Sequence, residues 1–86
     1  MQVNLLASPR DEKGLVVQFP YSKSDVDQIR LVLGLSWDKF AKVWTSAGPE
    51  VLLDMERFGI QPSWVSGDAR QIAEEFRQQL WNVMDA

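Results

Sequence analysis

The chain contains neither cysteine nor histidine in its 86 residues. The absence of cysteine excludes a disulfide framework and a thiolate metal site. The absence of histidine excludes an imidazole general base and the Ser-His and Cys-His nucleophiles. Paired carboxylates remain as acid–base candidates, but the twelve acidic residues are scattered and are better explained as solvated surface. We therefore expect no enzyme activity, no metal ion and no cofactor.

Two further absences concern nucleotides and membranes. The sequence has no Gly-x-Gly-x-x-Gly or Walker-type loop, so nucleotide binding of those kinds is not expected. Its longest apolar run is too short to span a bilayer, and the first residues lack the basic segment and hydrophobic core of a signal peptide. These patterns predict a cytoplasmic protein with no membrane partner.

Charge is distributed unevenly along the chain, whose net charge is −3. Residues 1–47 carry six basic and five acidic groups, a net charge of +1, whereas residues 48–86 carry three and seven, a net charge of −4. Strong stand-alone binding of nucleic acid depends on neutralising phosphates. The acidic balance therefore favours at most weak or local contact with DNA.

The length of the chain predicts a single domain over residues 1–86. Its periodicity predicts the α+β class, with a small antiparallel sheet of two hairpins packed against three helices in the order ββαββα(β)α. The expected elements are a hairpin from residues 2–7 and 14–19, a helix at 24–33 and a hairpin around 37–44. A helix at 50–58, an edge strand or coil at 60–65 and a last helix after residue 66 follow. Capping boxes at Ser22 with Asp25, or at Ser24 with Asp27, would begin the first helix. Ser66 or Asp68 would cap the last.

The stretch SWDKFAKVW, residues 36–44, is the most informative motif. A turn within residues 38–42 would place Trp37 opposite Trp44 on one face of a hairpin and Lys39 opposite Lys42 near its tip. The indoles have two explanations: they form a cross-strand pair that packs a core, or one of them is exposed and stacks on a base. The two lysines likewise have two explanations, as solvated loop residues or as a phosphate contact.

The segment from Phe19 to Ile60 resembles the HepA-related (HARP) domain found beside Swi/Snf-type annealing helicases. The residues that carry the resemblance are FPY at 19–21, the following helix, the W-D-x(5)-W hairpin and a second helix ending at Gly59. The resemblance implies a non-catalytic accessory module of superfamily 2 helicases. It also implies a DNA partner, branched or single-stranded, contacted by Trp37, Lys39, Lys42 and Trp44.

Other residues suggest additional contacts. Arg10 and Lys23 are further candidates for DNA binding. Trp64, Trp81 and Met84 either cover the edge of the core or expose an apolar patch for another protein or a second copy of this chain. The alternative function is therefore an acidic module for protein interaction or homodimer formation, with the same fold and no DNA binding.

Overall fold

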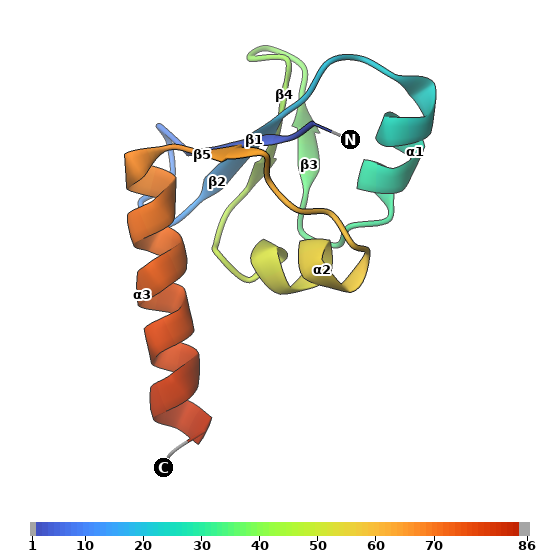
Figure 1. Cartoon of the computed structure of the whole chain (residues 1–86). Helices are drawn as coiled ribbons and strands as arrows, with labels where there is room; N and C mark the ends of the chain where they lie inside the picture. Colours follow the sequence, from blue (N-terminus) through green and yellow to red (C-terminus); the bar gives the residue numbers. More distant parts are fainter. Residues whose placement is uncertain (1, 85–86) are drawn as a thin grey trace.

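Five strands and three helices make up the protein in a computed structural model that describes residues 2–84, except for the side chains of residues 83 and 84 (Figure 1). The strands are β1 (Asn4–Ala7), β2 (Leu15–Gln18), β3 (Ser36–Asp38), β4 (Val43–Ser46) and β5 (Trp64–Val65). The helices are α1 (Lys23–Arg30), α2 (Val51–Arg57) and α3 (Gly67–Met84). The strands lie in the order β3-β4-β2-β1-β5 in one sheet. The predicted α+β class is confirmed.

The two predicted hairpins are the antiparallel pairs β1–β2 and β3–β4, and β2 joins them by pairing antiparallel with β4. β5 instead pairs parallel with β1, which makes the sheet mixed rather than antiparallel throughout. Two backbone bonds fix this edge: the amide of Ser63 donates to the carbonyl of Val3 at 2.8 Å and that of Ser66 to Leu5 at 2.9 Å. Pro62 precedes the strand at an edge, where a residue without an amide proton is tolerated.

The helix boundaries differ from prediction at α1. The helix begins at Lys23 and ends at Arg30, so Ser24 lies inside its first turn and cannot be its cap. Ser22 is the cap residue, but its hydroxyl makes no capping bond and lies 3.1 Å from the hydroxyl of Ser24. Both predicted capping boxes are therefore wrong. Leu33, the last residue of the predicted helix at 24–33, lies beyond the end of α1 and is exposed.

The other two helices follow their sequence signals more closely. The predicted stop at Gly59 is confirmed, since this residue adopts the left-handed φ of 71° just after α2. Of the two alternatives for α3, Ser66 is the cap, because its hydroxyl accepts a hydrogen bond from the amide of Ala69 at 3.1 Å.

The core lies on one face of the sheet. The registers place Leu5, Val17 and Trp44 on that face, and the three helices supply the residues that cover it. The buried cluster comprises Val3, Leu5, Leu15, Val17, Ile29, Val32, Val51, Met55, Ile60 and Ala69. Trp44 packs against this cluster from its margin while keeping part of its surface accessible.

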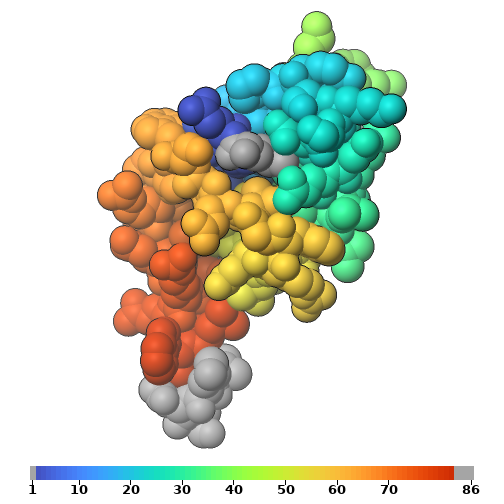
Figure 2. Space-filling view, turned by 45° about the vertical axis from the view of Figure 1, so that its right-hand side comes forward, coloured from blue at the N-terminus to red at the C-terminus, as the bar shows by residue number. Residues whose placement is uncertain are grey.

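α3 gives the molecule its elongated shape of 43 × 25 × 20 Å. Its first turns pack against β1, and the rest of the helix extends well past the sheet (Figures 1 and 2). None of the helices within residues 2–84 combines the length and the apolar character needed to cross a membrane.

Candidate nucleic-acid interface

The predicted pairing of the tryptophan hairpin is confirmed. Trp37 on β3 lies opposite Trp44 on β4, with their ring centroids 5.4 Å apart and their planes inclined at 57°. This tilted arrangement is favourable for two aromatic quadrupoles. Because β3 is the edge strand, Trp37 remains 51% exposed, whereas Trp44 is half-buried against the core. The pair thus combines one packing ring with one accessible ring.

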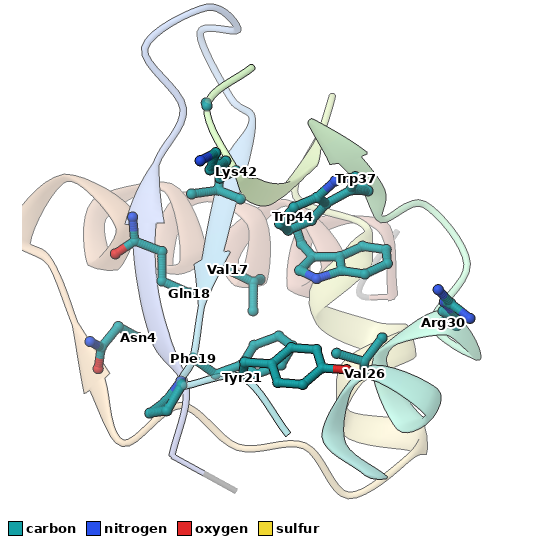
Figure 3. A pocket seen from close by; sticks show the side chains of 13 residues that line it. Asn4, Val17, Gln18, Phe19, Tyr21, Val26, Arg30, Trp37, Lys42 and Trp44 are labelled. Carbon is teal, nitrogen blue, oxygen red and sulfur yellow. The ribbon is translucent and has the colours of Figure 1, made fainter. Parts of the chain in front are cut away.

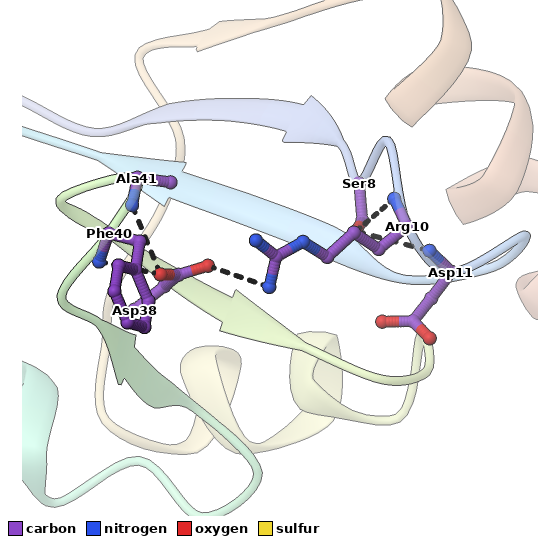
Figure 4. A network of polar contacts seen from close by, with 6 residues as sticks. All are labelled: Ser8, Arg10, Asp11, Asp38, Phe40 and Ala41. Carbon is purple, nitrogen blue, oxygen red and sulfur yellow. Dashed lines mark hydrogen bonds and ion pairs between the residues drawn. The ribbon is translucent and has the colours of Figure 1, made fainter.

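The turn of this hairpin is organised by Asp38. One carboxylate oxygen, Oδ1, accepts hydrogen bonds from the amides of Phe40 and Ala41 at 2.9 and 3.0 Å. The main-chain carbonyl of Asp38 accepts a further bond from the amide of Lys42 at 2.7 Å. The other carboxylate oxygen lies 3.3 Å from Nη1 of Arg10, which reaches it from the β1–β2 loop (Figure 4). The hydrogen bond from the amide of Ala41 is the main cause that lowers the pKa of Asp38. Burial opposes this shift, and the bond from Phe40 and the charge of Arg10 add to it.

Lys39 and Lys42 lie in the loop beyond the last paired residues, so the predicted cross-strand contact between them is not formed by the ladder. Lys42 adopts a left-handed backbone with φ of 58°, which an L-residue other than Asn or Asp seldom adopts. Lys42 lines a groove beside the hairpin, whereas the ammonium of Lys39 lies 5.4 Å from the centroid of the Phe40 ring. The two lysines therefore lie on different surfaces: Lys42 lines the groove, and Lys39 lies beside Phe40 at the tip of the hairpin.

The groove lies between this hairpin, the end of β2 and α1, and has a volume of about 870 Å³ (Figure 3). Its lining residues are Asn4, Val17, Gln18, Phe19, Pro20, Tyr21, Val26, Arg30, Trp37, Ala41, Lys42, Val43 and Trp44. Tyr21 is the most exposed of its aromatic residues, with 85% of its surface accessible. The groove thus brings accessible rings from three segments of the chain to one concave surface.

The charged side chains that line this groove are all basic among the described residues. Arg30 and Lys42 line the groove, and among the residues that the structure describes no Asp or Glu does. In the view of Figure 3 the two cations lie on opposite sides of the Trp37 and Trp44 rings. Of the predicted DNA-binding residues, Trp37, Lys42 and Trp44 therefore come together here. Arg10 is bound to Asp38 instead, and neither Lys23 nor Lys39 is among the lining residues.

Among the lining residues that were not selected from the sequence, Tyr21 and Arg30 contribute an exposed ring and a cation to the groove. Tyr21 belongs to the FPY stretch that carries the family resemblance, and its position directly before α1 was the available signal. Arg30 follows Val26 by four residues on α1, a spacing that puts both on one helix face. That signal becomes useful only once the hairpin is known to lie alongside the same face.

The predicted apolar patch of Trp64, Trp81 and Met84 is not one surface. Trp64 lies on β5 at the sheet edge, and Trp81 lies near the far end of α3. Trp81 lies about 21 Å further along the axis of α3 than Gly67, the residue at which the helix begins just after β5. The side chain of Met84 lies outside the described part of the chain. Trp81 is 66% exposed, which leaves its indole available to a partner.

A second groove, of about 670 Å³, runs between α2 and α3. Apolar side chains from both helices line it, among them Leu52, Leu53, Phe76 and Leu80. Glu56, Glu74, Arg70 and Arg77 also line it. The lining of this second groove is apolar with charges of both signs, whereas the lining of the first groove is aromatic with basic charges only.

The side chains that the structure describes contain no group of three carboxylates placed to hold a metal ion. In comparisons with known proteins, the chain matches no protein-family model, no curated protein and no solved structure. The resemblance to the HARP domain therefore depends on the residues between Phe19 and Ile60 alone and stays a prediction.

Proposed function

We propose that this chain is a non-catalytic DNA-binding module whose binding surface is the groove between the β3–β4 hairpin and α1. One observation carries the proposal: in a protein of net charge −3, this groove combines two cations with exposed aromatic rings and has no acidic residue among its described lining residues. The resemblance to HARP domains supports the same function and adds that the module would act beside a helicase motor.

The rings supply the contact for bases. Tyr21 and Trp37 each present an accessible aromatic face, and stacking of a base on such a face contributes about 1–3 kcal/mol. Unpaired bases can reach a ring in this way, whereas bases inside a duplex are already stacked on their neighbours. The groove is therefore suited to unpaired nucleotides.

The cations supply the contact for the backbone. Arg30 and Lys42 would each neutralise a phosphate and release a counterion, which makes binding dependent on salt. For a single strand, two such contacts predict a slope of log K against log salt of about −1.4. Two contacts give weak binding, in agreement with the acidic charge of the whole chain.

The test is fluorescence anisotropy with single-stranded, duplex and forked DNA at low and moderate salt. Arg30→Gln with Lys42→Gln should weaken binding at least tenfold and flatten the salt dependence. Lys13→Gln with Arg57→Gln makes the same change in net charge outside the groove and should have little effect. Absence of binding to every form of DNA at roughly 50 mM salt would contradict the proposal.

A second candidate is a protein-interaction or homodimer-forming module, and the α2–α3 groove is the observation that favours it. Its apolar lining includes the exposed side chain of Leu53, and α3 carries Trp81 beyond the globule. Light scattering over a concentration series tests this function. A dimer that becomes a monomer on Leu53→Glu or Trp81→Glu would support it, and a strict monomer that retains no partner would count against it.

A further inference from the structure

The loops of the two hairpins are joined by a contact between two charged side chains. Arg10 lies in the β1–β2 loop, and its Nη1 is 3.3 Å from Oδ2 of Asp38, the last residue of β3. Among the residues that the structure describes, no other ion pair is formed. Beyond the backbone ladder between β2 and β4, this pair is therefore a direct link between the two hairpins.

Each partner of this ion pair is also fixed to its own loop. On one side, the hydroxyl of Ser8 accepts a hydrogen bond from the amide of Arg10 at 3.2 Å. On the other, Oδ1 of Asp38 accepts the amides of Phe40 and Ala41, while its Oδ2 faces the guanidinium (Figure 4). A displacement of one loop is therefore transmitted to the other through a single guanidinium–carboxylate contact.

The Arg10 side chain extends along the sheet to reach its partner. The β1–β2 loop ends at Leu15, which is paired with Ser46 at one end of β4. Asp38 is paired with Val43 at the other end of the same strand. The rise of a strand separates these two ends by about 10 Å, and the arginine reaches across this interval (Figure 4). The ion pair thus connects opposite ends of β4.

The ion pair lies on the face of the sheet opposite the core. Val17 belongs to the core cluster, so the preceding residue, Val16, points to the other face. Val16 is only 6% exposed although it is not part of that cluster. Its burial agrees with the course of the Arg10 side chain along β2, because the methylenes of arginine cover apolar surface. The hairpin is therefore held from the side opposite Trp37 and Val17, which both line the groove.

Lys42 connects this ion pair to the groove. Its amide donates to the main-chain carbonyl of Asp38 at 2.7 Å, and it lines the groove, whereas Arg10 is not among the lining residues. From this geometry we infer that Arg10 is a positioning residue: by holding Asp38, it fixes the loop that carries Lys42 and does not contact the ligand. The inference rests on the proposed DNA binding of the groove and adds a residue outside it on which that binding depends.

The exposure of the two side chains sets the size of the effect. Arg10 is 70% exposed and Asp38 13%, and ion pairs with an exposed partner contribute little to the stability of a fold. We expect Arg10→Gln to remain folded and to bind DNA about two- to fivefold more weakly. Because Arg10 neutralises no phosphate, the slope of log K against log salt should stay unchanged, whereas Lys42→Gln should flatten it.

Two substitutions that change the net charge in opposite directions test the inference by fluorescence anisotropy with single-stranded DNA. Arg10→Gln removes a positive charge and Asp38→Asn a negative one, yet both break the same ion pair. A positioning role predicts that both weaken binding, and that the double variant binds no more weakly than the weaker single variant. Direct attraction between Arg10 and DNA predicts instead that Asp38→Asn strengthens binding. Lys13→Gln, the same charge change in the same loop, is the matched control and should leave the affinity nearly unchanged.

A measurement without DNA examines the loop itself. Amide hydrogen exchange at Lys42 should be about two- to fivefold faster in Arg10→Gln than in the wild type, because the bond to Asp38 opens more often. The Lys13→Gln control should exchange at the wild-type rate. A thermal melt of each variant confirms that it is folded.

The outcomes separate this inference from the proposed function. A wild type that binds no DNA overturns the proposed function and the role of Arg10 in it, whatever the exchange rates. Where the wild type binds, three results overturn the positioning role and leave the groove as the DNA site: unaltered affinity in Arg10→Gln, tighter binding by Asp38→Asn, or unchanged exchange at Lys42. A flattened salt dependence in Arg10→Gln would assign this residue to a phosphate contact and would also overturn the inference.

Discussion

Trp37 and Trp44 face each other across the β3–β4 hairpin with 5.4 Å between their ring centroids, yet only Trp44 packs against the core. Trp44→Ala should therefore lower the free energy of unfolding by about 3 kcal/mol. Trp37→Ala should cost about 1 kcal/mol, most of it the aromatic pair. Guanidinium denaturation of the two single variants and the double variant should give a coupling energy of roughly 0.5–1.5 kcal/mol. Equal costs for the two single variants would contradict this division of roles.

Lys42 offers a way to separate stability from binding. Its φ of 58° is unfavourable for a residue with a Cβ and is accessible to glycine without steric cost. Lys42→Gly should therefore leave the free energy of unfolding unchanged or raise it by up to about 1 kcal/mol. The same variant should weaken the proposed DNA binding, because it removes one of the two groove cations. Thermal melts and anisotropy on one preparation check both effects, and a variant that loses stability would contradict the reasoning about the backbone.

Gly14 is a position where the chain has no room for a side chain. A Cβ there would lie 2.5 Å from the carbonyl oxygen of Ser46 and 2.7 Å from Cβ of Asp11. Gly14→Ala should therefore destabilise the protein by about 1–3 kcal/mol through displacement of the β1–β2 loop. Gly67→Ala is the matched control, because a Cβ at Gly67, at the start of α3, meets nothing within 4 Å. Urea denaturation should show the control as neutral or slightly stabilising, and equal losses in both variants would refute the steric argument.

Acid should loosen the hairpin turn through Asp38. The folded protein lowers the pKa of this carboxyl below its ordinary value of 3.8, so the unfolded chain takes up the proton first as the pH falls. The resulting stabilisation is fully present above that ordinary value and is lost as the pH falls through the folded pKa. Asp38→Asn keeps an oxygen for the two amides but removes the charge. The stability difference between the wild type and this variant should be constant near neutral pH and shrink below about pH 4. A difference that grows in acid would contradict the assignment.

Much of the fold could be predicted because local signals agreed with the tertiary structure. Alternating apolar residues, turn formers and the glycine after α2 located both hairpins and the helix between β4 and β5. The pairing of Trp37 with Trp44 followed from symmetry about the loop. The end of α1 was predicted too late, because Val32 and Leu33 continue the helical spacing while only Val32 is buried. Periodicity alone does not reveal where a tertiary contact ends a helix.

The site was predicted less completely because it depends on contacts between distant segments. The hairpin gave Trp37, Lys42 and Trp44, but Tyr21 and Arg30 reach the groove only through the packing of α1 beside it. Lys39 and Lys42 are close in sequence, yet the left-handed backbone at Lys42 gives the two side chains different surroundings. Arg10 was predicted to contact DNA, but it forms an ion pair with Asp38 of the other hairpin, a contact that the sequence does not reveal.

The parallel pairing of β5 with β1 has a consequence for how the molecule opens. This junction spans two residues of each strand, and α3 follows β5 after one residue. The C-terminal segment can therefore detach as a cooperative unit while the four antiparallel strands keep their ladders. Amide hydrogen exchange would show this as one set of protons in β5 and α3 that exchanges faster than those of β2 and β4. The segment that detaches shares no described residue with the groove between the β3–β4 hairpin and α1, so its opening would expose Leu5 to solvent without changing the proposed DNA-binding surface.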